Sequence, residues 1–306
     1  MESATEQTTE GTLRLVDSLG RFQEALFIED PRIRDRETLR NVAPLIEEIE
    51  ASYEYLSGIS REHAHKLVEV LSPLSEYSKF YESTTSVLRC IDRSIEVLQK
   101  VTHKDDAIFA LEKTYSEFRD SIISSSNKNL DRSHSYLKTT NLDFLASSLL
   151  NEVTGDLLER YYVPKLVENM GYQLKSRTVP TSVGDVEVDI RAEKDKIIGL
   201  ENLEKHKKKD VIIVETKATV NSEDIRSLSK KSKAILENYH KELEIWKYDF
   251  ASETWIVACY GWNDELKNLA RSLNIRPIDG EELENMLQKY NLLHRGRPPC
   301  RKRPKR

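Results

Sequence analysis

Three polar residues follow apolar stretches in the second half of the chain, and their types suit phosphate chemistry. Asp189 lies near the end of residues 184–191, where apolar and acidic side chains alternate, which predicts a strand with one solvated face. Glu215 and Lys217 follow the β-branched run 211–214, which predicts a buried strand. Because Glu215 and Lys217 are two apart, they point to the same side of that strand. Two carboxylates and a lysine so placed can hold a divalent cation and a scissile phosphate.

This set of side chains fits the hydrolysis of a phosphodiester bond. The reaction needs an activated water, neutralisation of the negative charge on the phosphate and stabilisation of the leaving oxygen. Mg²⁺ held by carboxylates supplies all three. A lysine beside the metal orients or deprotonates the water and offsets charge in the transition state. The structural alternative is that Asp189 ends a strand at a turn, while Glu215 and Lys217 form a same-face ion pair.

The composition predicts two domains and no membrane span. The chain has 306 residues, of which 32% are charged and 8% aromatic, and this length suits roughly two domains. No stretch approaches the ~20 apolar residues of a membrane helix, and the polar N-terminus is unlike a secretory signal. The cysteines, Cys90, Cys259 and Cys300, are odd in number and far apart. Such cysteines fit a reducing, cytoplasmic location and argue against a disulfide framework or a zinc site.

The charge is divided unevenly along the chain. Residues 295–306 hold seven basic side chains and no acidic one, so removing them from a net charge of −5 leaves −12 for residues 1–294. Contact with a polyanion is therefore expected to be local or mediated by metal. Residues 294–306 are predicted to be a disordered basic tail that contacts nucleic acid by charge; the alternative is a solubilising tail or a localisation address.

The first domain, residues 1–140, is predicted to be helical. A polar, disordered segment is expected over residues 1–11, a new helix start at Ser72-Pro73 and a polar linker from about Ser124 to Thr140. Apolar residues alternate at spacings of three and four, as in a coiled-coil seam, at Leu74, Tyr77, Tyr81, Thr84, Leu88, Ile91, Ile95 and Leu98, and again at Ile108, Leu111, Tyr115, Phe118 and Ile122. Two interpretations stay open: an arm for self-association or partner binding, and an intramolecular bundle.

The second domain, residues 141–293, is predicted to be α/β, which makes the whole chain α+β and multidomain. Helical, strand and helical patterns follow one another in the order α, β, β, β, α, β, α, with room for one more short strand near Ile275. Pro164 is expected to kink or break the first of these helices. Cys259 lies in an apolar run that predicts a central strand, where it is expected to serve packing.

The spacing of these motifs resembles that of a known superfamily. Asp189 followed 26 residues later by Glu215-Thr216-Lys217, within an αβββαβ order, is similar to the PD-(D/E)XK nucleases, which have a restriction-endonuclease-like fold. Archaeal proteins that join a coiled-coil half to such a domain are similar in outline. Val188 stands where the name-giving proline would be, and the helix after Lys217 lacks the glutamine–tyrosine pair of the exonuclease branch.

The resemblance implies a metal-dependent site. It assigns metal binding to Asp189, Glu215 and the carbonyl of Thr216, and catalysis to Asp189, Glu215 and Lys217. Glu159 in Leu158-Glu159-Arg160 matches a further acidic position of the resolvase-like members, with Glu152 in reserve. The implied cofactor is Mg²⁺ or Mn²⁺. Lysines of the next helix are expected either to approach a DNA backbone or to form a solvated face: Lys230, Lys231 and Lys233.

The expected function is hydrolysis of DNA phosphodiester bonds by a Mg²⁺-dependent deoxyribonuclease. The alternative is an inactive protein of the nuclease fold that serves as a DNA-binding or assembly scaffold with a coiled-coil arm. A third interpretation places the function in the helical half, as a regulatory partner protein. The expected partners are DNA and a second copy of the chain bound through the helical region, with no membrane.

Overall fold

The computed structural model describes residues 2–101, 105–198, 206–246, 249–293 and 300. The chain divides into two compact units, of which one covers residues 11–150 and the other contains residues 1–10 and 151–302. The division falls inside a helix, α5 (Leu142–Leu157), and not at the end of the expected linker. No helix among the described residues is long and apolar enough to cross a membrane. The architecture is α+β, with a helical region followed by a mixed sheet with helices.

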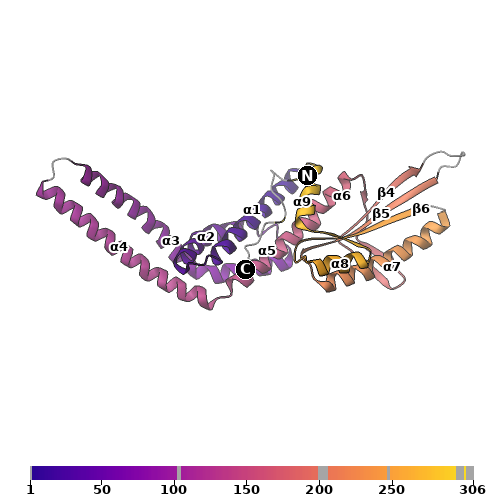
Figure 1. Ribbon diagram of the computed structural model, residues 1–306, viewed down its shortest axis with the longest axis horizontal. Coiled ribbons are helices and arrows are strands. Elements are labelled where there is room, and N and C mark those ends of the chain that lie inside the picture. The colour runs from indigo at the N-terminus through magenta and orange to yellow at the C-terminus, as the bar shows by residue number, and fades with distance from the viewer. Residues whose placement is uncertain (1, 102–104, 199–205, 247–248, 294–299, 301–306) are drawn as a thin grey trace. The chain divides into compact units, whose positions relative to one another are not determined.

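The first unit is built from long helices with a shared apolar core. Its helices are α1 (Glu2–Leu26) from Gly11 onward, α2 (Pro31–Ser52), α3 (Gly58–Lys100) and α4 (Asp106–Thr139). Asp30, Ser57 and Asp105 cap the N-termini of the last three by accepting backbone hydrogen bonds. The core of the unit is formed by residues that are fully buried, among them Leu19, Phe22, Leu45, Ile49 and Leu67. Figure 1 shows α3 and α4 as a helical hairpin.

Three predictions for the helical half are wrong. Helix α1 begins at Glu2, within the segment expected to be disordered, and Met1 lies outside the described residues. Helix α3 runs without a break through Pro73, because Leu71 and Leu74 on either side are fully buried and hold it in place. The polar linker is instead the last part of α4, in which Leu130 and Ser133 are buried. In the last two cases burial of a few side chains outweighs the local preference of the sequence.

The second unit is organised around a five-stranded mixed sheet with the strand order β1-β4-β5-β6-β7. Its strands are β1 (Gln173–Leu174), β4 (Ile190–Ile198), β5 (His206–Thr219), β6 (Asp249–Tyr260) and β7 (Ile275–Ile278), while β2 (Thr178–Thr181) and β3 (Gly184–Glu187) form a separate hairpin. The pairs β1–β4 and β4–β5 are antiparallel, whereas β5–β6 and β6–β7 are parallel. Helices α7 (Ser222–Trp246), α8 (Asp264–Ser272) and α9 (Gly280–Lys289) complete the unit, together with α6 (Val163–Asn169).

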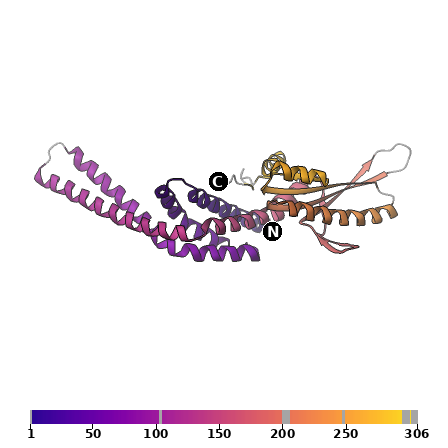
Figure 2. The same cartoon turned by 60° about the horizontal axis from the view of Figure 1, so that its bottom comes forward.

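Both faces of the central strands are buried. Val211 and Ile213 of β5 belong to one apolar cluster with Ile225 and Leu228 of α7 and Ala270 of α8. The alternate residues of β5, Ile212 and Val214, are also almost fully buried, as is Trp255 of β6. Figure 2 shows α7 running along one face of this sheet. The prediction that residues 211–214 form a fully buried strand is confirmed, and β7 is the additional short strand expected near Ile275.

The stretch 184–191, predicted to be one strand, is divided between two sheets. Residues Gly184–Glu187 form β3, which pairs with β2, and the chain then bends at Asp189 before β4 begins at Ile190. The prediction is wrong because alternation of apolar and polar residues continues unchanged while the strand changes its pairing partner. Gly184 has φ +109° at the tight turn that joins β2 to β3. Asp189 therefore precedes a strand of the sheet and does not end one.

A disulfide bond joins Cys259, at the end of β6, to Cys300, and Cys90 is free and exposed. The expectation that the cysteines argue against a disulfide is wrong, since odd number and wide spacing give no information on which side chains the fold brings together. Cys259, expected to serve packing, is half-buried and forms this bond. Apart from Cys300, the predicted basic tail lies outside the described residues.

We expect the disulfide to be detectable by peptide mapping. Digestion without reductant should yield one peptide pair linked through Cys259 and Cys300, with Cys90 alkylated. Because the bond closes a loop with a sequence separation of 41, Cys259→Ser should lower the free energy of unfolding by about 2–4 kcal/mol under non-reducing conditions. Cys90→Ser is the matched control and should leave it unchanged. Equal stability of both variants would contradict the pairing.

Candidate functional site

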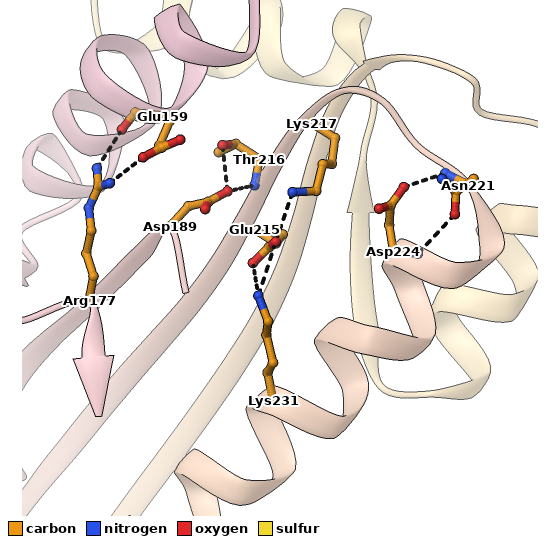
Figure 3. A network of polar contacts seen from close by, with 9 residues as sticks. All are labelled: Glu159, Arg177, Asp189, Glu215, Thr216, Lys217, Asn221, Asp224 and Lys231. Atoms are coloured by element: carbon orange, nitrogen blue, oxygen red, sulfur yellow. Dashed lines mark hydrogen bonds and ion pairs between the residues drawn. The ribbon is translucent and has the colours of Figure 1, made fainter. Parts of the chain in front are cut away.

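Asp189 contacts β5 immediately beyond the last pair of the β4–β5 ladder, which joins Ile190 to Val214. Its Oδ2 accepts hydrogen bonds from the backbone N–H of Thr216 at 2.7 Å and from the Thr216 hydroxyl at 2.8 Å. Its Oδ1 makes no hydrogen bond to the described residues. Figure 3 shows Asp189 between Glu159 and Glu215. The structure thus brings the predicted aspartate beside the predicted Glu-Thr-Lys segment.

Glu215 is a buried carboxylate with two lysine partners, and only 7% of the residue is exposed. Lys217 lies 3.0 Å from its Oε1, and Lys231 of α7 donates to both carboxylate oxygens at 3.4 and 3.3 Å. A buried carboxylate stays ionised at low cost only when it is paired and hydrogen-bonded in this way. The two ammonium groups therefore compete with any cation for the oxygens of Glu215.

Lys217 is held in its cationic form. Burial acts to lower the pKa of Lys217, but the charge and the hydrogen bond of Glu215, together with the charges of Asp189 and Asp224, raise that pKa above its usual value. A lysine of this kind is a poor proton acceptor at neutral pH. Of the two roles that the sequence suggested for Lys217, orientation and charge stabilisation are compatible with this geometry, whereas deprotonation of water is not.

Glu159 lies in a π-helical segment, Leu158–Tyr162, that follows α5 directly and precedes Pro164 at the start of α6. Helical backbone continues from α5 through this segment into α6, so the chain has no break at Pro164, and the kink expected there stays a prediction. Glu159 accepts a short hydrogen bond from the guanidinium of Arg177, which precedes β2. π-Helical turns inside longer helices occur often at functional sites. Arg177 was not anticipated, because it lies 18 positions after Glu159 in the sequence and no pattern in between would place the two in contact.

A pocket of about 320 Å³ connects these elements. Its walls come from α5, the π-helical segment, the bend before β4 and the end of β5, and the lining residues include Glu152, Asp156, Glu159, Asp189, Thr216 and Lys217. Asp156 was missed by the sequence analysis and Glu152 was only a reserve candidate. Spacings of four and three place Glu152, Asp156 and Glu159 on one side of a helix, and this periodicity was the available signal.

The donor set fits a hard divalent cation in part. Within the described part of the chain, no three His, Cys, Asp or Glu side chains are close enough together to hold a metal by themselves. Mg²⁺ commonly binds through one or two carboxylates and keeps several waters. Asp189 Oδ1, one oxygen of Glu215 and the Thr216 carbonyl are oxygen donors of the kind that Mg²⁺ prefers. The N–H and C=O of one strand residue point to the same edge, so this carbonyl faces the side on which Asp189 lies.

The lysines expected on the next helix do not behave as one group. Lys231 is engaged with Glu215, while Lys230 and Lys233 are exposed. The helix itself starts from a reciprocal cap, in which the Asn221 side chain accepts from the backbone N–H of Asp224 and the Asp224 side chain accepts from that of Asn221 (Figure 3). This cap fixes the start of α7 and thereby the position of Lys231 over β5.

No protein-family model, curated protein or solved structure matches the chain.

Proposed function

We propose that the protein is a Mg²⁺-dependent deoxyribonuclease whose second unit has the restriction-endonuclease-like fold of the PD-(D/E)XK superfamily. The observation that carries the proposal is the contact of Asp189 with Thr216, because it places one carboxylate beside the Glu215–Lys217 pair at the rim of an acidic pocket. The mixed sheet, with helices on both faces, is the architecture that such a fold requires.

Each residue of the proposed site has a distinct role. A divalent cation bound there would activate water and neutralise charge on the phosphate. Asp189 and Glu215 would hold it, with the Thr216 carbonyl as the third protein ligand. Lys217, which is cationic, would stabilise charge that develops on the phosphate. Lys231 would keep Glu215 oriented, and Glu159 would act from the opposite wall of the pocket, with Arg177 fixing its position.

A second candidate function is that of a DNA-binding scaffold that has kept the fold without the activity. The observation that favours it is the pair of lysines on Glu215, since two ammonium groups already neutralise that carboxylate. In this case DNA binding would survive Glu215→Gln, and no metal would be required. The two candidates thus differ in whether the protein cleaves the bound DNA when a divalent cation is added.

The test of the nuclease proposal is a cleavage panel with the full chain. Labelled single-stranded, duplex, flap and four-way-junction DNA would be incubated with Mg²⁺ or Mn²⁺, and with EDTA as control. The proposal expects cleavage of at least one substrate in the presence of metal and none with EDTA. Binding of the same DNA without cleavage under every metal condition would favour the scaffold.

The helical unit is proposed to bind a second copy of the chain through the tip of the α3–α4 hairpin. Within the described residues of 92–129, no side chain is buried. The seam of α4 is largely exposed, at 49% for Leu111 and 54% for Phe118, and Val97 of α3 is 63% exposed. Contacts between α3 and α4 here include polar ones, such as the Asp92–Arg119 ion pair at 2.7 Å. The intramolecular seam predicted for Ile108 to Ile122 is thus only partly used.

A helical partner is favoured because the exposed side chains keep the three-and-four spacing of a coiled-coil seam. A second copy suits this face because residues 87–122 hold six basic and seven acidic side chains, so that two copies pair without net repulsion. Symmetric dimers are the commonest oligomers, and two hairpins pack as a four-helix bundle.

We expect Phe118→Asp to convert a dimer into a monomer at micromolar concentration, because the change places a charge in the shared apolar seam. Light scattering after size-exclusion chromatography measures the mass. Lys113→Asp, which introduces the same side chain at an exposed polar position of α4, is the control and should remain dimeric. A dissociation constant of roughly 100 µM is taken as the upper limit for a useful weak dimer. A wild-type protein that is still monomeric at about 100 µM would contradict the proposal.

A further inference from the structure

A second pocket of the sheet unit lies under the β2–β3 hairpin and has a volume of about 700 Å³. One wall is formed by the hairpin residues Val179, Pro180, Thr181 and Ser182, and the opposite wall by Asn238 and Tyr239 of α7. The floor is formed by Arg191 and Glu193 of β4 and by Lys209 of β5. Asn238 donates to the Pro180 carbonyl at 3.2 Å and so connects α7 to the hairpin. The volume lies within the range of small-molecule sites, about 300–1,000 Å³. None of these residues belongs to the proposed nuclease site.

The anionic group of this pocket is already neutralised. Glu193 receives a hydrogen bond from Lys209 at 3.0 Å and a short one from the hydroxyl of Tyr239. Burial acts to raise the pKa of Glu193, but these two hydrogen bonds and the charges of Lys209 and Lys175 lower it below its usual value. Lys209 and Glu193 therefore form an ion pair at neutral pH, and neither contributes a free charge to the pocket.

Arg191 is the charged group that remains. Its guanidinium lies over the ring of Tyr239, with 5.8 Å between Cζ and the ring centroid. Its Nε is buried and has no hydrogen-bond partner within the described part of the protein, and no carboxylate among the described residues pairs with Arg191. A buried donor without a partner is costly. A guanidinium presents a planar fork of donors that matches the oxygens of a phosphate.

We propose that this pocket binds a phosphate group, with Arg191 as its principal ligand. The pocket has two cationic side chains and one anionic side chain, an excess of one positive charge, which suits an anion. The ring of Tyr239 lies against the guanidinium, and Ser182 lines the opposite wall of the pocket. The phosphate comes either from a nucleic-acid strand or from a free nucleotide, and both present the same oxygens to Arg191.

The location connects this pocket with the proposed nuclease site. Arg191 follows Asp189 by two residues and is paired with Ile213, which precedes Glu215 by two. Two strand residues span about 7 Å. If the protein is a nuclease, a phosphate at Arg191 belongs to the strand that is cut; the phosphate site itself does not depend on that activity.

The test measures binding in EDTA, where the proposed metal site does not contribute. Three probes would be titrated into the full chain by calorimetry: inorganic phosphate, a nucleoside monophosphate and a ten-nucleotide single-stranded oligonucleotide. We expect at least one probe to bind, and Arg191→Ala to weaken it about tenfold or more, as for loss of charge-assisted hydrogen bonds. Arg226→Ala, an exposed arginine on α7, is the control and should change the affinity less than twofold.

Arg191→Lys keeps the positive charge but removes the paired donors of the guanidinium, so it tests the two properties separately. The melting temperature of this variant shows whether it is folded. It should keep the fold and still lose most of the affinity, because lysine lacks the paired donors. If only the oligonucleotide binds tightly, the phosphate comes from a nucleic-acid strand. If the nucleoside monophosphate binds as tightly as the oligonucleotide, the phosphate comes from a free nucleotide. Binding that Arg191→Ala leaves unchanged, or no binding of any probe to the wild type, would overturn the proposal. Glu215→Gln should leave this binding intact, so failure of the nuclease proposal is recognised separately.

Discussion

Glu215→Gln is expected to reduce the rate of metal-dependent DNA cleavage by about 1,000-fold or more, because it removes a negative charge that would hold the cation. The substitution preserves the size of the side chain and one acceptor oxygen. It leaves Lys217 and Lys231 without their shared partner, so the rate must be compared at equal folded fraction, as shown by circular dichroism. Single-turnover cleavage of the best substrate in the panel is the measurement.

The control for Glu215 is Glu237→Gln. Glu237 lies on α7, the helix that also supplies Lys231, but is exposed, and its substitution should leave the rate within twofold of wild type. A Glu215→Gln protein that is folded and cleaves at the wild-type rate would contradict the assignment of Glu215, whatever the activity of the other variants.

Lys217→Met should lower the cleavage rate by about 100-fold, since it removes a positive charge next to the developing charge of the phosphate. Lys230→Met, at an exposed position of α7, is the control. DNA affinity measured in EDTA should change far less than the rate, because the effect is expected in the transition state. Equal losses of affinity and rate would instead indicate a simple binding role.

The pH dependence follows from the upward shift of the pKa of Lys217. Because the folded-state pKa is raised, the ammonium form and its stabilising pair with Glu215 are fully present below the usual lysine pKa of about 10.4. They are lost only as the pH rises through the raised value. The ratio of the wild-type rate to the Lys217→Met rate should therefore stay constant between pH 7 and pH 9. A ratio that falls within this range would show that Lys217 loses its proton there and acts as a base.

Sequence reasoning was most accurate for strands whose apolar composition indicates burial on both faces. Residues 211–214 are β-branched throughout, and only a strand covered on both faces accommodates them. Residues 184–191 were misplaced because alternation specifies a face but not a partner strand, and the partner changes at Asp189. The position of Asp189 beside Thr216 was nevertheless anticipated, since it depends only on β4 and β5 being neighbours.

The helical half shows the opposite relation between pattern and structure. Its three-and-four spacing predicted helices over residues 74–98 and 108–122 and these are present in α3 and α4. Helix ends were misjudged at Pro73 and after Ser124, because burial of distant side chains decides them. The sequence also gave no means to tell which face of α4 is covered, and polar contacts such as Gln99–Glu112 occupy part of the inner face.

The polar partners of the candidate site were the least predictable. Arg177 and Lys231 lie 18 and 16 residues from the carboxylates they contact, and only the folded chain brings them together. Their effect is chemical: Lys231 and Lys217 neutralise Glu215, and Arg177 neutralises Glu159. A carboxylate predicted from its spacing as a metal ligand therefore enters the site already paired, which is the reason that the nuclease and the scaffold remain two separate proposals to test.

The most direct test is to measure Mn²⁺ binding to the full chain by electron paramagnetic resonance without DNA, so that no substrate is cleaved during the measurement. The wild-type chain and Glu237→Gln should bind Mn²⁺ alike, whereas Asp189→Asn and Glu215→Gln should each weaken binding about tenfold or more, because each removes one charged ligand. Mn²⁺ binding of equal strength in all four proteins would contradict a metal centre at Asp189 and Glu215.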